Sequence, residues 1–249
     1  MRPQVDPLLR GAGQGDLMGS SVTSPGARDA AAMRPPRFWR IGAPVFVAGF
    51  IASLVAGSVL VPVSLFLPAA GAAELRTYYT QGTLGVAVAA VLQLVAAGGL
   101  VRFGTGLAIA SGGGRRVRSS TWLAAGAFAL SSLLSLVLDG LAAGAADSTL
   151  LVLARLTLVL GGPVHLAGLA GMLWFASRDG LAAGRGPRFL LRAGTVIGPL
   201  LLVSLLSIAI PPVTRLEPLW RLLAAVWLLS IACSGVRPAG QKVAAERRP

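Results

Sequence analysis

Residues 150–176 combine polar side chains and a helix break within one apolar stretch of the chain. The stretch contains His165, which is the only histidine, and Gly161, Gly162 and Pro163 lie just before it. Proline has no backbone N–H and its ring crowds the preceding turn, so carbonyl groups near Pro163 should lack helical partners. Histidine titrates near neutral pH and can relay protons, and broken membrane helices often line binding sites in transporters. The pattern therefore predicts a polar site at this break.

Further polar side chains within the apolar runs would complete the lining of such a site: Gln93, Ser131, Ser135, Thr157 and Thr195. The alternative is a structural role, in which a neutral His165 is hydrogen-bonded to a neighbouring helix and the nearby glycines allow close packing. The sequence places no carboxylate at the depth of His165, and a single histidine makes a short proton relay. This absence favours the structural interpretation.

Asp139 and Arg155 are a second pair of candidates, at the two ends of the connection between apolar runs. If these runs form a hairpin, the two side chains lie at similar depth. Because unpaired charge inside a membrane is costly, an ion pair between them is expected. In the alternative, Arg155 extends its long side chain to the outer lipid headgroups and Asp139 is hydrated.

Other catalytic chemistries lack the residues that they require. One cysteine, Cys233, and one histidine cannot build a Cys/His metal cluster, and no H-E-x-x-H motif is present. The chain has no G-x-S-x-G motif of the serine hydrolases. Glycines 112–114 precede arginines, but the Gly-Lys-Ser/Thr signature of a phosphate-binding loop is missing. We therefore expect no metal, no cofactor and no catalytic residues, with Cys233 as a small buried apolar side chain.

Six apolar runs must position these residues, and each approaches the roughly 20 residues that one membrane crossing requires. The chain is 55% hydrophobic and only 12% charged, whereas a typical soluble domain is about 25% charged. We predict an all-α membrane protein, a six-helix transmembrane bundle over residues 41–235. Its spans are expected at about 42–68, 83–103, 121–141, 149–176, 189–211 and 219–235.

The polar segments at 1–40 and 236–249 are expected to be disordered basic tails. Met1, Met18 and Met33 are alternative starts that would leave all six spans intact. A signal peptide is the competing interpretation of the first apolar run. Signal cores have about 7–15 residues, and the run at 41–67 is longer, so it is interpreted as a span.

Basic residues alternate between the two sides of the predicted bundle. The N-terminal tail, the segments after the second and fourth spans, and the C-terminal tail hold six, four, four and four of them. The three opposite segments hold one, one and two. The positive-inside rule then places both termini in the cytoplasm. The same rule explains the net charge of +13, so no nucleic-acid partner is needed. The basic segments should also be attracted weakly to anionic lipid.

The function predicted from these features is a non-enzymatic membrane component, either an accessory subunit or a small-solute transporter. The preference for arginine, with Lys242 as the only lysine, is typical of a GC-rich genome. The chain resembles the class of small polytopic α-helical proteins of a bacterial cytoplasmic (inner) membrane, which is its expected location. Small residues every fourth position at Gly49, Ser53 and Gly57 suggest close contacts with other helices, in a homo-oligomer or with other membrane subunits.

The alternative function is a membrane-embedded enzyme acting on lipid or quinone. It would use His165 or the arginines of the segments at 104–120 and 177–192. Basic segments of this kind are expected at the cytoplasmic side in any case. A coloured or quinone-bearing preparation would favour the enzyme, and a colourless protein that co-purifies with partners would favour the non-enzymatic component.

Overall fold

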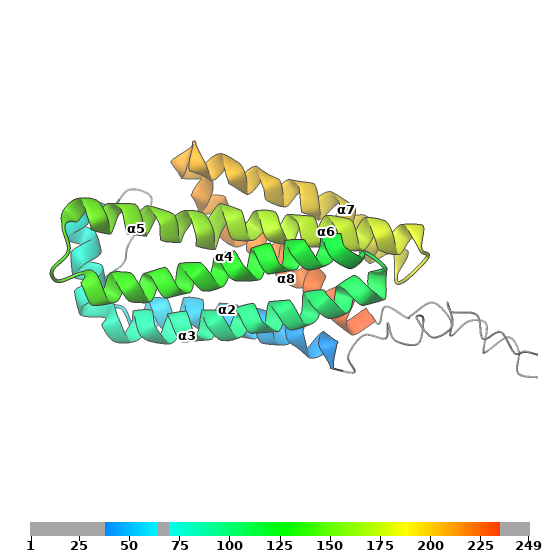
Figure 1. Cartoon of the computed structure of the whole chain (residues 1–249), viewed down its shortest axis with the longest axis horizontal. Helices are drawn as coiled ribbons and strands as arrows, with labels where there is room; N and C mark the ends of the chain where they lie inside the picture. Colours follow the sequence, from blue (N-terminus) through cyan, green and yellow to red (C-terminus); the bar gives the residue numbers. More distant parts are fainter. Residues whose placement is uncertain (1–37, 64–69, 235–249) are drawn as a thin grey trace, which may run out of the picture. The chain divides into compact units, whose positions relative to one another are not determined.

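The computed structural model describes residues 38–63 and 70–234, and this part of the chain consists of helices and their connections, without strands (Figure 1). The α-helices are α2 (Gly42–Val59), α3 (Ala72–Ser111), α4 (Gly114–Leu141), α5 (Asp147–Val159), α6 (His165–Ala182), α7 (Arg188–Leu202) and α8 (Glu217–Ser234). Shorter helical segments are η1 (Trp39–Ile41), η3 (Leu160–Val164), η4 (Val203–Ile208) and η5 (Pro211–Leu216).

Six of these helical stretches are long and apolar enough to cross a membrane, counted over the described residues. They run over Trp39–Val59, Ala72–Ser111, Gly114–Leu141, Asp147–Ala182, Arg188–Ile208 and Pro212–Ser234. The predicted all-α class and the number of long apolar helices are therefore confirmed for this part of the chain.

The helices extend beyond the predicted spans. At 1.5 Å per residue, the 40 residues of α3 measure about 60 Å, whereas the hydrocarbon core of a bilayer is about 30 Å thick. The spans predicted at 83–103 and 121–141 imply a loop over 104–120, which is wrong because α3 continues to Ser111 and α4 begins at Gly114. Only a tight turn separates them, at which Gly112 has a φ of +82°, a left-handed conformation that glycine adopts without strain.

The ordered bundle begins earlier than predicted. Trp39, which the sequence analysis assigned to a disordered tail, is 4% exposed and its ring lies 5.3 Å from that of Phe103. The first apolar helix ends at Val59, and the outer part of the span predicted to residue 68 lies partly outside the described residues. Residues 1–37 of the tail predicted at 1–40, and the tail predicted at 236–249, lie outside them as well.

Neighbouring helices pack in the order α2 on α3, α3 on α4, α4 on α6 and α6 on α7 (Figure 1). Small residues bring their backbones close, as expected where apolar packing alone gives little driving force. A Cβ at Gly99 would lie 2.8 Å from the Gly42 carbonyl oxygen, and one at Gly168 would lie 2.6 Å from the Ala124 Cα. Both positions therefore require glycine.

The small residues proposed for contacts between chains serve contacts within this chain. A Cβ at Gly49 would lie 3.0 Å from the Leu92 carbonyl oxygen on α3. A similar close approach occurs on α7, where a Cβ at Gly198 would lie 3.0 Å from the Ala170 carbonyl oxygen on α6. On the first span, a Cβ at Gly57 would meet no atom within 4 Å. These faces consequently give no support for a homo-oligomer.

Candidate functional site

A cavity of about 680 Å³ lies between α2, α3, α4, the α5–η3 segment and α8. Its wall combines aliphatic side chains with hydroxyl groups from Ser53, Ser58, Ser131, Ser135 and Thr157. The remaining polar lining comes from two tyrosines, one glutamine and one charged pair: Tyr78, Tyr79, Gln93, Glu217 and Arg221. The cavity is thus a polar space among helices whose outer surfaces are apolar.

The predicted helix break forms one wall of this cavity. Residues 160–164 are π-helical, with Pro163 inside the turn. In an α-helix the His165 N–H would bond to the Gly161 carbonyl, but here it bonds to the carbonyls of Leu160 and Gly162 instead. The Gly161 carbonyl therefore loses its helical partner. π-Bulges of this kind are frequent at functional sites.

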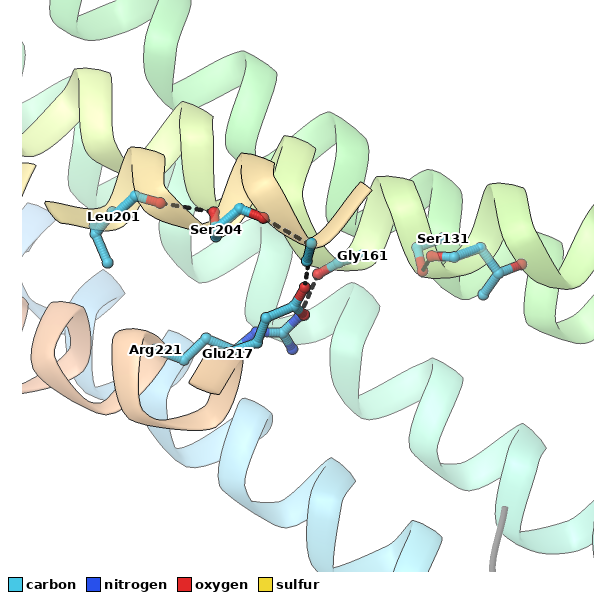
Figure 2. A network of polar contacts seen from close by, with 8 residues as sticks. Ser131, Gly161, Leu201, Ser204, Glu217 and Arg221 are labelled. Carbon is cyan, nitrogen blue, oxygen red and sulfur yellow. Dashed lines mark hydrogen bonds and ion pairs between the residues drawn. The ribbon is translucent and has the colours of Figure 1, made fainter. Parts of the chain in front are cut away.

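Arg221 on α8 supplies the missing partner. Its Nη2 donates a hydrogen bond to the Gly161 carbonyl oxygen, as Figure 2 shows. The same nitrogen lies 3.7 Å from Glu217 Oε2, one turn earlier on α8. The guanidinium also lies over the Phe50 ring, 5.4 Å from its centroid, an arrangement that stabilises a cation away from water.

Glu217 is buried, with 6% of its surface exposed. Ser207 Oγ lies 3.1 Å from its Oε1 and 2.6 Å from the Ser204 carbonyl oxygen, and the single hydroxyl proton serves one acceptor at a time. Ser204 donates in turn to the Leu201 carbonyl oxygen (Figure 2). This chain of polar contacts joins η4, α8 and η3 inside the bundle.

The two glycines of the break let these polar groups approach the backbone. A Cβ at Gly162 would lie 2.7 Å from Glu217 Oε2, and one at Gly161 would collide with Ser131 Oγ. Ser131 Oγ donates to the Thr157 carbonyl oxygen at 2.9 Å. Glycine at both positions thus makes room for the carboxylate on one side and for the serine on the other.

Most of the predicted polar lining is brought together at the cavity. Gln93, Ser131, Ser135, Thr157 and the two glycines line it, and the Gln93 and Ser132 side chains are hydrogen-bonded at 2.8 Å. The Thr157 hydroxyl is buried and has no hydrogen-bond partner among the described residues. Thr195 lies elsewhere, because its hydroxyl donates to the Arg192 carbonyl oxygen on α7.

His165 does not line the cavity. It is 1% exposed, its Nδ1 lies 2.9 Å from the Ala124 carbonyl oxygen, and its ring stacks on Phe128 at 4.7 Å between centroids. A carbonyl oxygen only accepts, so Nδ1 carries the proton. This geometry favours the structural interpretation of the histidine.

Asp139 and Arg155 form no ion pair, in contrast to the hypothesis from the sequence. Arg155 is exposed on α5, whereas Asp139 is half-buried on α4 and its Oδ1 has no hydrogen-bond partner within the described chain. The reason is helical phase: Ala154 belongs to a buried cluster with Leu138 of α4, and the next residue is turned about 100° away. At this end of the bundle the ion pair is Arg76–Asp147, 2.8 Å.

Glu217 and Arg221 are the site residues that the sequence analysis missed. Glu217 lies just before the span predicted at 219–235 and Arg221 lies in its first turn, and neither was singled out. Their spacing was a usable signal, since opposite charges four residues apart share one face of a helix. In the described ranges, no group of three or more potential metal ligands comes together.

Comparison with protein-family models, with curated proteins and with solved structures gives no match for this chain. No residue therefore receives a role from a relative. The cavity, the broken helix and the Glu217–Arg221 pair are the features from which a function can be inferred.

Proposed function

We propose that the chain is a multi-pass membrane protein that carries a small polar solute through the cavity between α2, α3, α4 and α8. The supporting observation is the buried Glu217–Arg221 pair, set against the freed Gly161 carbonyl at the wall of this cavity. Charged residues within membrane helices are costly, and where they occur they mark substrate or ion pathways. A volume of about 680 Å³ suits a small ligand, since such sites measure about 300–1,000 Å³.

The proposed location is a bacterial cytoplasmic membrane, with both termini in the cytoplasm. The support is the distribution of basic side chains. Arg115, Arg116, Arg188 and Arg192 are exposed near the α3–α4 and α6–α7 connections, and cytoplasmic segments carry such an excess. The bilayer is the only partner that this proposal requires.

The break at η3 gives the proposal a physical basis for movement. A π-turn with two glycines and a proline holds fewer regular backbone hydrogen bonds than an α-helix, so the α5 and α6 halves can change their angle at low cost. Arg221 bonds to the backbone at this point. Binding of a solute to Arg221 would alter that bond and bias the angle between the two halves.

A carrier must expose its site to both faces of the membrane in turn. In a Cys233→Ser background, the Gln93→Cys variant places a thiol at the cavity wall, and the Val95→Cys variant places one on the exposed face of the same helix. A membrane-impermeant trimethylammonium methanethiosulfonate is applied to right-side-out and to inverted vesicles.

The carrier proposal predicts that the Gln93→Cys variant reacts from both faces, whereas the Val95→Cys variant, which would face lipid, reacts from neither. Reaction of the Gln93→Cys variant from one face only would indicate a binding subunit and contradict a carrier. Reaction from neither face would mean that the cavity is closed to water, which also contradicts the proposal.

A further inference from the structure

We propose that the solute is a zwitterion with an apolar side chain, of the amino-acid class, whose carboxylate binds Arg221 and the Thr157 hydroxyl and whose ammonium group binds Glu217. The proposal deepens the proposed function and rests on it only in that the cavity takes up a solute. Four observations support this ligand class: the charges of the cavity wall cancel, two hydrogen-bond donors have no partner, the Glu217–Arg221 distance is long, and much of the wall is apolar.

The charge balance of the cavity favours a solute without net charge. Among the described lining residues, Arg221 and Glu217 are the charged ones, and their charges cancel. A simple anion or cation would bring an uncompensated charge into a low-dielectric interior, which is strongly unfavourable. A zwitterion adds one charge of each sign and leaves the balance unchanged.

Two unused donors indicate where a carboxylate would bind. Arg221 makes its hydrogen bond to Gly161 and its contact with Glu217 through Nη2, and its Nε is buried with no hydrogen-bond partner in the described chain. The Thr157 hydroxyl is equally buried and unpartnered. Thr157 lies one helical turn before Gly161, on the same face, so both donors are near the point where Arg221 reaches the broken helix. A carboxylate offers two acceptor oxygens to such a pair.

The Glu217–Arg221 pair is open enough to take an ammonium group. Its 3.7 Å separation exceeds the 2.7–2.9 Å or so of a charge-assisted hydrogen bond. Glu217 Oε2 lies against Gly162, where the missing side chain leaves room beside the backbone. The Gly161 carbonyl oxygen lies beside it as a further acceptor. An ammonium group has three donors and can use both oxygens.

The rest of the wall accommodates an apolar side chain. Leu54, Val61, Val86, Phe128 and Leu158 contribute aliphatic and aromatic surface to the same cavity. A sugar or other polyol would leave this surface facing hydroxyl groups, with no gain from apolar burial. An amino acid with an apolar side chain satisfies both the charged end and the apolar wall.

The test compares molecules that differ by one charged group. Tritiated L-leucine is bound at equilibrium to the purified full chain in detergent and competed with 4-methylpentanoate, which lacks the ammonium group, and with 3-methylbutylamine, which lacks the carboxylate. We expect leucine to compete about tenfold or more better than either, because each analogue loses a charge-assisted contact. Equal competition by either analogue would overturn the zwitterion proposal. Tritiated phenylalanine is measured in parallel, and failure of both leucine and phenylalanine to bind would overturn the proposal as well.

Variants assign the two ends of the ligand. Thr157→Val should retain the fold, because the hydroxyl has no partner to lose, and should weaken leucine binding about tenfold. Glu217→Gln should weaken leucine binding and strengthen that of 4-methylpentanoate, because Arg221 then has no compensating carboxylate in the cavity wall. Arg155→Gln, on the exposed face of α5, is the matched control and should bind leucine normally. Wild-type affinity in the Thr157→Val variant would refute the assigned carboxylate position.

The two tests separate the ligand class from the carrier function. If the Gln93→Cys variant reacts from both faces but no amino acid binds, the carrier stands and the ligand class is wrong. If leucine binds as expected but the thiol reacts from one face only, the ligand class stands and the carrier function is wrong.

Discussion

Arg221 is bound at three places: the Gly161 carbonyl, the Glu217 carboxylate and the Phe50 ring. Its side chain is 17% exposed, so little of its hydration survives. These contacts substitute for water, and each partner in turn depends on the arginine. Removing one of the two charges should therefore lower the stability of the fold more than removing both, because a single buried charge is left uncompensated.

The Arg221→Met variant should therefore be destabilised by about 3–5 kcal/mol, the usual cost of breaking a buried ion pair. The double variant Glu217→Gln, Arg221→Met should recover part of this loss, since no buried charge remains. Unfolding in detergent, followed by tryptophan fluorescence, measures both. Arg155→Met makes the same change at an exposed site and should stay within about 0.5 kcal/mol of the native chain. An additive double variant would show that the two side chains do not interact.

His165 is expected to stabilise the fold without contributing to solute binding. The His165→Leu variant loses the hydrogen bond to the Ala124 carbonyl oxygen and should lose about 0.5–1.5 kcal/mol of stability. Leucine binding should be unchanged, because the ring does not line the cavity. The His165→Asn variant provides a polar comparison. Native stability combined with loss of uptake in both variants would instead support a proton relay.

At the scale of elements, the η3 break depends on glycine. The Gly162→Ala variant would place a Cβ 2.7 Å from Glu217 Oε2 and should cost about 1–3 kcal/mol, as overpacking does. Gly126→Ala on α4, where a Cβ meets nothing within 4 Å, should be neutral or stabilising by up to about 1 kcal/mol. Thermal unfolding of the two variants compares them directly. Equal effects would mean that Glu217 does not lie against η3.

The helices could be predicted from the sequence because each apolar run has the length of a membrane crossing. Their ends could not, because hydropathy marks where apolar residues stop and caps decide where a helix stops. α3 continues through residues 104–111 until Gly112 turns the chain. At its other end, Arg76 fixes the α4–α5 connection by donating to the Ala142 and Ala145 carbonyls.

The candidate site could be predicted in part. Gln93, Ser135 and Thr157 stand out as polar residues in apolar runs, and Pro163 marks the break. The proposed Asp139–Arg155 pair failed because similar depth does not imply the same helical face. Tertiary packing decides which residues of the helix break face α8. Sequence periodicity alone does not reveal this orientation.

At the scale of the whole chain, apolar side chains cover the outer faces of helices whose polar groups gather inside. Exposed examples are Leu84, Val152, Val196 and Val226, all more than half exposed. Single exposed residues of this kind are common in soluble proteins, but large contiguous apolar surfaces are not. Lipid contact explains them together with the interior cavity, and the account therefore depends on the six apolar helices crossing a bilayer.

Labelling of single cysteines from each face tests this claim most directly. In the Cys233→Ser background, Thr77→Cys, Ser148→Cys and Leu216→Cys lie in the segments predicted outside, and Arg115→Cys and Arg188→Cys lie in those predicted inside; all five native residues are exposed. The account predicts that an impermeant maleimide added to intact cells modifies only the first three, and that inverted vesicles show the reverse. Modification of all five from the same face would contradict six crossings.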